Sequence, residues 1–483
     1  MVSEREFEKL SFSDAPKIVT KEIPGPKAKI ILKKELENET PTRIAPIGIP
    51  LVWDEAFGAT FKDPDGNIFI DLSSGVAVNN VGHSHPEIVQ VIKNECTRLM
   101  HTPDGSCSNR QRLGEKLSEI APGGLKRNVR MAYGLSGSSA VEIALKFARA
   151  STGKSIILAF QGAYHGSIGT ALTLTTSPTF RSKYRPFMPF VERLGPYPYC
   201  YRCPFSMTYP SCDLQCAKYV EFQLTDPYSG IDVKNVAALI VEPMQGEGGY
   251  VPTPPGWLKY MYDLCKKLGI LVIDDEVQMG MGRTGRMFTV EHFGLEPDII
   301  TLGKALGGDL PFSAIMARKD LVQDLEPFSH VLTAVGNSMS CAVACKNIDL
   351  IQDGLLERST ELGAYTLQKF KELAEERKII GDVRGMGMGM ALELVRNRET
   401  KEPLQTGEMV RMLWMLRDKG VYVLPCGRYG NILRVIPPLV ISKSLIDKAV
   451  EIISNVLATL EMGRYSVNWT FQPEQKAVLG ANA

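Results

Sequence analysis

A lysine and an aspartate near the ends of two apolar segments are the residues of this chain best suited to organic catalysis. Lys304 ends an apolar, strand-like run at residues 297–304, and Asp275 lies near the end of a similar run at residues 270–278. A lysine held at a strand end can form a Schiff base with a carbonyl group, and a nearby aspartate can hold the proton of a pyridinium ring. The two residues together suggest pyridoxal phosphate chemistry.

Strand geometry selects one acid of this segment over its neighbours. Asp275 and Val277 are two residues apart, so in a strand both side chains point to one face, while Asp274 and Glu276 point to the other. Asp275 could then pair with a ring nitrogen while Val277 packs beneath the ring. Taken alone, the segment favours a simpler interpretation, in which the acids belong to a strand end near solvent.

A run of small residues at positions 134–140 precedes a helical pattern and could hold a phosphate group. Small residues let backbone N–H groups approach an anion, and a helix N-terminus adds a favourable potential. Ser138 or Ser139 could equally be an ordinary helix N-cap without a ligand, which is the favoured interpretation of the run alone. Tyr164, which follows another apolar run, could stack on a flat cofactor.

The elements that must position these residues alternate along the chain. Short apolar runs typical of buried strands are separated by amphipathic helical stretches, a pattern that predicts an α/β fold with a mainly parallel sheet between helices. Longer helices and short strands after about residue 345 indicate a smaller α+β domain. We therefore expect three parts: an N-terminal arm with a hairpin (1–75), a large domain (76–340) and a small C-terminal domain (341–483).

Composition excludes several classes of partner. The chain has 483 residues, 44% of them hydrophobic and 23% charged, with a formal net charge of +1. This balance gives no electrostatic reason to expect nucleic acid or a membrane as a partner, and no apolar stretch reaches transmembrane length. The charged N-terminus does not resemble a secretion signal, so we expect a cytoplasmic chain with reduced cysteines.

Several short motifs occur in one order along the chain. They are Ser136-Gly137-Ser138, Gly162-Ala163-Tyr164-His165-Gly166, Glu242-Pro243-Met244-Gln245-Gly246-Glu247, Asp275-Glu276-Val277-Gln278 and the run that ends in Lys304. This order closely resembles the class III (omega-type) aminotransferases, the group of fold-type I pyridoxal phosphate enzymes that contains 4-aminobutyrate and ornithine aminotransferases. The similarity covers most of the chain, and the family also includes amino acid racemases and epimerases.

The resemblance implies a role for each matched residue. Lys304 would carry the cofactor as an internal aldimine and shuttle the proton, and Asp275 would pair with the pyridine nitrogen. The residues expected to bind the cofactor are Gln278 at the ring hydroxyl, Tyr164 and Val277 on the ring faces, and Gly137 and Ser138 at the phosphate. Thr333 matches a threonine that reaches the phosphate from a neighbouring subunit, which implies a homodimer or a larger assembly.

Two further matches concern the substrate. Arg434 matches an arginine that grips a substrate α-carboxylate, and Glu247 matches a switch carboxylate that pairs with this arginine when the substrate has no such group. Without the resemblance, Glu247 would be interpreted as a surface acid and Arg434 as a solvated charge. Relatives that handle a distal carboxylate often carry arginine after Tyr-His-Gly, whereas this chain has Ser167, so α-amino acids or less charged amines are better candidate substrates than 4-aminobutyrate.

The same first step serves two possible reactions. After the α-proton is removed, its return to the cofactor gives an aminotransferase that uses an amino acid or amine and a keto acid, which is the function we expect. Its return to the substrate carbon from the opposite face would give an amino acid racemase or epimerase, which needs a second acid–base group that the sequence does not locate. A silent binding protein on the same fold would be expected to lack Lys304 or Asp275, and both are present.

Four cysteines form two pairs outside these motifs: Cys200 and Cys203, then Cys212 and Cys216. This spacing could bind zinc or form a redox centre, but no histidine supports it and the gap between the pairs is short for common zinc modules. The thiols could equally be ligand-free or bridged. We therefore assign no metal ligand from the sequence.

Overall fold

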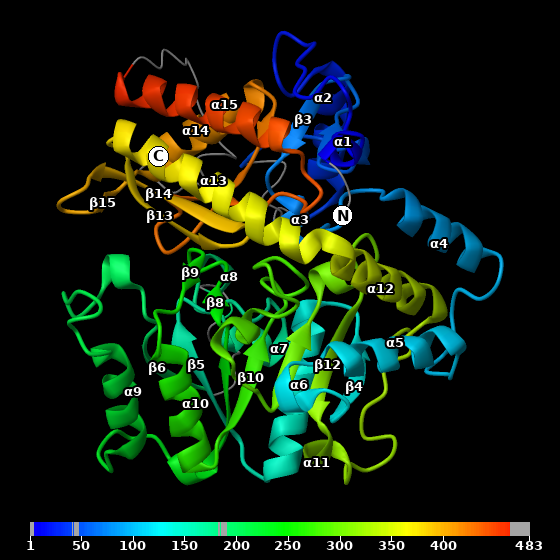
Figure 1. Cartoon of the computed structure of the whole chain (residues 1–483), viewed down its shortest axis with the longest axis vertical. Coiled ribbons are helices and arrows are strands. Elements are labelled where there is room, and N and C mark those ends of the chain that lie inside the picture. Colours follow the sequence, from blue (N-terminus) through cyan, green and yellow to red (C-terminus); the bar gives the residue numbers. More distant parts are fainter. Residues whose placement is uncertain (1–3, 41, 43–47, 182–183, 185–190, 464–483) are drawn as a thin grey trace. The chain divides into compact units, whose positions relative to one another are not determined.

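The computed structural model describes residues 4–40, 42, 48–181, 184 and 191–463. The chain divides into two compact units (Figure 1). The first unit contains residues 1–76, 81–85 and 360–483, and the second contains residues 77–80 and 86–359. The three-part division expected from the sequence stays a prediction.

A seven-stranded sheet forms the centre of the second unit. Its strand order is β4-β12-β11-β10-β7-β5-β6, in which every neighbouring pair is parallel except the two pairs made by β12. The strands are β4 (Val129–Gly134), β5 (Ile156–Gln161), β6 (Glu192–Pro196), β7 (Val236–Val241), β10 (Leu271–Asp275), β11 (Ile299–Leu302) and β12 (Ser313–Arg318). The α/β fold class with a mainly parallel sheet is therefore confirmed.

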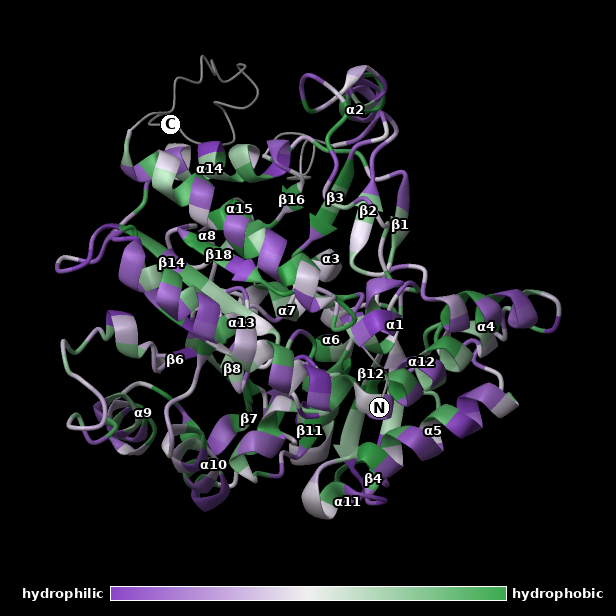
Figure 2. Ribbon diagram, turned by 45° about the horizontal axis from the view of Figure 1, so that its top comes forward, coloured by the Kyte–Doolittle hydropathy of each residue, from purple (hydrophilic) through white to green (hydrophobic). Residues whose placement is uncertain are grey.

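Apolar strands explain why this sheet is buried. All six residues of β7 and all four of β11 are buried, as expected of strands covered on both faces. The helix α6 (Gly137–Thr152) packs its alanine-rich side on β4, β7 and β10–β12, while α10 (Trp257–Leu268) contacts β10. In Figure 2 the ribbon of α10 carries both hydrophilic and hydrophobic residues, the pattern of a helix with one buried face.

The remaining elements of the second unit are mostly helical. They are α4 (Pro86–Cys96), α5 (Ser108–Ile120), α7 (Gly169–Leu174), α8 (Pro178–Arg181), α9 (Gln215–Thr225), α11 (Lys319–Val322), α12 (Ser338–Leu350) and the short hairpin of β8 (Met244–Gln245) with β9 (Val251–Pro252). Among the described residues, no helix is both long and apolar enough to cross a membrane.

The first unit contains two smaller sheets. One pairs the hairpin β1 (Glu55–Phe57), β2 (Thr60–Lys62) and β3 (Ile68–Asp71) with β16 (Val421–Tyr422), so the hairpin expected from the sequence around its Asp-Gly turn is confirmed. The other has the order β13-β14-β18-β17, and β15 pairs with β14 outside this order. Its strands are β13 (Ile380–Met386), β14 (Gly389–Asn397), β15 (Glu402–Pro403), β17 (Leu424–Cys426) and β18 (Ile432–Val435).

Helices complete the first unit. They are α1 (Glu4–Glu8), α2 (Pro26–Asn38), α3 (Ser74–Ala77), α13 (Leu356–Glu376), α14 (Thr406–Asp418) and α15 (Lys443–Glu461). The long helix α15 begins at an N-cap, Ser442, whose hydroxyl accepts the Leu445 N–H. The helices and short strands expected after residue 345 are thus present.

Candidate active site

Lys304 begins a tight turn directly after the central strand β11. The strand ends at Leu302, Gly303 is extended, and Lys304 has a left-handed backbone with a φ of 42°. Its carbonyl oxygen accepts hydrogen bonds from the N–H groups of Gly307 at 3.0 Å and Gly308 at 2.9 Å. These two bonds hold a backbone conformation that a residue with a side chain rarely adopts.

Asp275 is the last residue of β10 and is only 5% exposed. Its Oδ1 accepts hydrogen bonds from the Thr301 hydroxyl at 3.0 Å and the Val277 N–H at 3.1 Å. Thr301 is its direct partner in the pairing of β10 with β11, so sheet register places the hydroxyl there. The interpretation of Asp275 as an acid near solvent is therefore wrong.

The same hydrogen bond explains why the strand is shorter than expected. The sequence pattern predicts a strand through residue 278, but β10 ends at Asp275 because its carboxylate accepts the N–H of Val277, two residues further on. Such a side-chain bond turns the backbone away from the sheet. Val277 and Gln278 consequently lie in a turn and still line the same pocket as Asp275.

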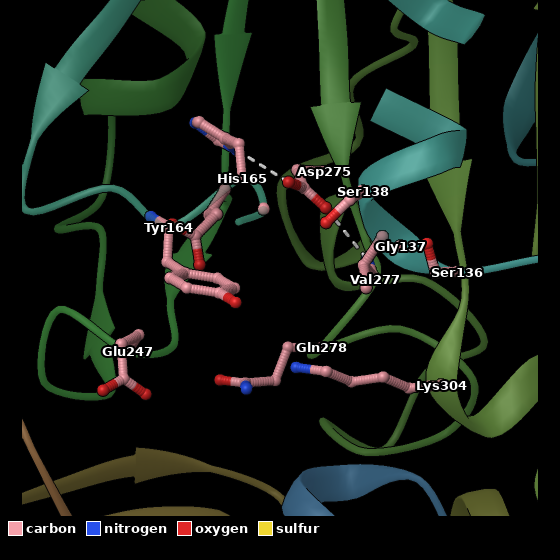
Figure 3. A pocket seen from close by; sticks show the side chains of 12 residues that line it. Ser136, Gly137, Ser138, Tyr164, His165, Glu247, Asp275, Val277, Gln278 and Lys304 are labelled. Atoms are coloured by element: carbon pink, nitrogen blue, oxygen red, sulfur yellow. Dashed lines mark hydrogen bonds and ion pairs between the residues drawn. The ribbon is translucent and has the colours of Figure 1, made fainter. Parts of the chain in front are cut away.

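His165 is a functional neighbour that the sequence interpretation missed. Its Nδ1 lies 2.6 Å from Asp275 Oδ2, and both side chains are buried (Figure 3). Because a carboxylate accepts, Nδ1 carries the proton in this bond. His165 follows β5, and the carboxyl ends of β5 and β10 share one edge of the sheet, a relation that could have drawn attention to it.

The N-terminus of α6 forms another wall of the pocket. Ser136 is the N-cap: its side chain accepts the Ser139 N–H, and the Ser139 hydroxyl closes a capping box. The alternative that Ser138 or Ser139 is the N-cap is therefore wrong. Gly137 and Ser138 occupy the first turn, where backbone N–H groups have no acceptor within the helix and can face an anion.

One cavity of about 130 Å³ brings most of the expected residues together (Figure 3). In Figure 3 the Lys304 side chain points across the pocket toward Gln278, and Glu247 lies on the opposite side from Lys304. The expected residues that line the cavity are Lys304, Asp275, Gly137, Ser138, Tyr164, Val277, Gln278 and Glu247; Ser136, His165, Gly166 and Glu242 complete it.

Two expected residues are not among those that line this cavity. Thr333 is exposed in the second unit, in the segment before α12. Arg434 belongs to the first unit, where it lies buried on β18 between Ala391 of β14 and Leu424 of β17. Their roles stay predictions.

The lining fits pyridoxal phosphate. Gln278 Oε1 is buried with no hydrogen-bond partner among the described residues, so a polar group in the pocket could bond the Gln278 amide. A Cβ on Gly137 would come within 2.6 Å of Val277 Cγ1, which shows how closely the α6 N-terminus meets this wall. Asp275, the α6 N-terminus and Lys304 then offer a carboxylate, anion-facing amides and an amine for the ring nitrogen, phosphate and aldehyde.

Asp274 and Glu276 lie beside Asp275 in sequence and do not line the pocket. Both are buried, and burial together with their mutual repulsion raises the Asp274 pKa well above its ordinary value. Burial also raises the pKa of Glu276 to about 8. Two buried carboxyl groups so close together favour a state that keeps a proton.

The four paired cysteines line a second, small and nearly apolar cavity with Tyr197 and Pro254. Burial raises the pKa of the Cys216 thiol to about 11. Within the described parts of the chain, no three His, Cys, Asp or Glu side chains are placed to hold a metal ion, and none of the ten cysteines forms a disulfide.

Known proteins place the chain in a family. The family described as Aminotransferase class-III matches residues 45–457. The leucine/methionine racemase of Thermococcus litoralis is 37% identical over 86% of this chain and 92% of its own length. The 4-aminobutyrate aminotransferase of Mycobacterium tuberculosis is 35% identical over 93% of this chain and 100% of its own length.

A solved structure extends the similarity to the whole fold. The taurine:2-oxoglutarate aminotransferase of Bifidobacterium kashiwanohense, in complex with PLP and glutamate, has a TM-score of 0.79. It is 25% identical, and the match covers 85% of this chain and 93% of that protein. The chain therefore belongs to the class III aminotransferase family.

Proposed function

We propose that the protein is a pyridoxal phosphate-dependent aminotransferase, which moves an amino group between an amino acid or amine and a keto acid. The observation that carries this proposal is the convergence of Lys304, Asp275 and the α6 N-terminus on one cavity. An amine, a buried carboxylate and a set of backbone amides are the groups that the cofactor requires, and a relative of the same fold is in complex with PLP.

Asp275 has the task of holding a proton on the ring nitrogen. Its carboxylate is fixed from two sides, since His165 donates to Oδ2 while Thr301 donates to Oδ1. When bound, pyridoxal phosphate supplies an electron sink for the pair left on the substrate carbon after proton removal. The rigid, buried Asp275 carboxylate would stabilise the positive charge on the protonated ring nitrogen, and this charge makes the ring a better electron acceptor.

Lys304 moves the proton. In its neutral form the Nζ amine can take the proton from the substrate carbon and release it at a second carbon within reach of the flexible side chain. The left-handed backbone of Lys304 fixes the origin of that side chain at the cavity wall. Transamination follows when the proton is delivered to the cofactor side.

In this proposal two residues matched to the family would hold the substrate. Arg434 would bind the α-carboxylate through the planar fork of its guanidinium, and Glu247 would pair with it when no such carboxylate is present. Ser167 follows Tyr-His-Gly and offers no positive charge for a distal carboxylate. Thr333 would reach the phosphate of a second copy, so the active enzyme would be at least a homodimer, which we place in the cytoplasm.

A lysine variant tests the central assignment. We expect Lys304→Ala to lose essentially all turnover and to leave no cofactor attached after borohydride reduction, whereas wild-type protein retains it on residue 304 by peptide mass spectrometry. The surface variant Lys259→Ala is the matched control, because Lys259 is exposed on α10 and pairs with Asp263. Normal turnover by Lys304→Ala would overturn the assignment.

A racemase or epimerase is the second candidate function. The similarity to the Thermococcus litoralis racemase is as strong as the similarity to the aminotransferases. Racemisation also requires a second acid–base group facing Lys304, and Glu247 lies across the pocket from it (Figure 3). The arrangement thus offers a candidate for the second proton donor.

One experiment separates the two reactions. The purified enzyme, loaded with cofactor, is given a panel of single L-amino acids with and without a keto acid acceptor, and both product and enantiomer are measured. Strict dependence on the acceptor supports the aminotransferase. Formation of the D-amino acid without any acceptor instead establishes the racemase.

A further inference from the structure

Glu242 is a buried acid in the pocket that the proposed reaction leaves without a task. It follows β7 directly and is 7% exposed. Its two carboxylate oxygens accept different backbone N–H groups: Oε1 accepts from Tyr164 at 3.1 Å, and Oε2 accepts from Gly246 at 2.9 Å. One side chain therefore ties together two loops that are far apart in the sequence.

The two loops carry groups on different sides of the cavity. Tyr164 lies in the turn after β5 and presents the ring that we expect to stack on the cofactor, while Gly246 immediately precedes Glu247. The backbone of Glu242 is itself fixed, because the Tyr197 hydroxyl donates to its carbonyl oxygen at 2.9 Å. Because the Glu242 carboxylate is fixed and bonds both loops, it sets the distance between them.

The charge of Glu242 decides whether both bonds can exist. An ionised carboxylate accepts at both oxygens, whereas a protonated carboxyl group donates from one of them and leaves one N–H poorly paired. Burial raises the pKa of Glu242 to about 7, and Asp275 adds to that effect, while His165 and the two backbone N–H groups oppose it. Burial, with a smaller contribution from the Glu242 charge, raises the pKa of Tyr197 well above its ordinary value.

We propose that Glu242 is a positioning residue, whose ionised carboxylate sets the separation between the Tyr164 wall and the Gly246–Glu247 turn. The proposal rests on the proposed function, because it assigns these walls to cofactor and substrate. Loss of the carboxylate charge would free one of the two turns and loosen the cavity. The activity would then depend on pH through the shape of the site as well as through its proton transfers.

Hydrogen–deuterium exchange of the apoprotein tests this directly, without cofactor or turnover. In Glu242→Gln one side-chain oxygen becomes an NH2 group that cannot accept, so short peptides spanning residues 162–166 or 244–248 should exchange about tenfold faster or more. Glu296→Gln is the matched control, because the exposed Glu296 accepts a backbone N–H from Gly124 far from the cavity. That variant should leave both peptides unchanged.

The wild-type protein provides a second arm that needs no variant. After correction for intrinsic exchange, protection of these peptides should fall between pH 8 and pH 6, and in Glu242→Gln it should stay constant over this range. Affinity for pyridoxal phosphate should follow the same pH dependence in the wild type. Equal protection in wild type and variant at pH 8, or pH-independent protection in the wild type, would overturn the proposal. A wrong reaction assignment would leave the exchange result intact, so the two failures are distinguishable.

Discussion

The close contact between Gly137 and Val277 makes a quantitative prediction about cofactor binding. A Cβ at position 137 would lie 2.6 Å from Val277 Cγ1, about an ångström nearer than the usual 3.5–4.0 Å between carbon atoms. In Gly137→Ala, the Val277 side chain can move only toward the cavity, where the cofactor ring would lie in the proposed site. Binding then requires the crowded arrangement to be restored.

The expected cost follows from this overlap. Overpacking of a rigid site typically costs about 1–3 kcal/mol, which corresponds to about 5- to 150-fold weaker affinity for pyridoxal phosphate. The Val277 backbone cannot shift to relieve the overlap, because its N–H donates to Asp275. The affinity is measured by titrating the apoprotein with pyridoxal phosphate and following the quenching of tryptophan fluorescence.

A matched glycine provides the control. Gly407 is the second residue of α14, and a Cβ there would meet no atom within 4 Å. Gly407→Ala should therefore bind the cofactor as the wild type does and be as stable or slightly more stable. If Gly137→Ala bound pyridoxal phosphate with wild-type affinity, the assignment of Gly137 and Val277 to the cofactor site would be refuted.

Two further predictions concern stability. Thr301→Val should lower the free energy of unfolding by about 1–2 kcal/mol, because it removes a hydrogen bond to the buried Asp275. Thr173→Val is the control and should leave this free energy unchanged, because the buried Thr173 hydroxyl has no partner among the described residues. Equal losses for the two variants in urea unfolding would contradict the prediction. Asp274 and Glu276 have raised pKa values in the folded state, so the fold binds more protons than the unfolded chain and loses stability as pH rises from about 4 to 8. Asp274→Asn should weaken that loss and raise Tm at pH 8 by about 2–4 °C, with no gain at pH 5; parallel Tm profiles for variant and wild type would count against it.

The strands that carry chemistry were predictable because their sequences are apolar without interruption. The apolar run expected at residues 297–304 contains β11, and the other short apolar runs include β5 and β7. Buried parallel strands need apolar residues on both faces, so their pattern does not depend on distant neighbours. The helix after residue 136 was equally predictable from its alanine-rich periodicity.

The boundaries were harder to predict, since side-chain hydrogen bonds decide them. β10 ends early because Asp275 bonds the N–H of Val277, and Ser136 rather than Ser138 caps α6. Each feature depends on the rotamer of a single polar side chain, and the hydrophobic pattern of a sequence does not predict such rotamers. Sequence periodicity therefore located the elements within a few residues but left their ends open.

The partners of the expected site residues were beyond sequence reasoning for a different reason. His165 is 110 positions from Asp275, and only the order of strands in the sheet brings β5 and β10 to one edge. The fold similarity implied a sheet without specifying which polar residue would meet which carboxylate. The same holds for Glu242, whose two bonds connect loops that follow different strands.

The left-handed backbone at Lys304 implies a trade-off between stability and activity. A left-handed conformation costs a residue with a Cβ about 1–2 kcal/mol, and glycine escapes most of this strain. Lys304→Gly would then be more stable than Lys304→Ala, although neither has an amine to react. Glycine would therefore give the more stable fold at this position, and the presence of lysine there lowers the free energy of unfolding by a measurable amount.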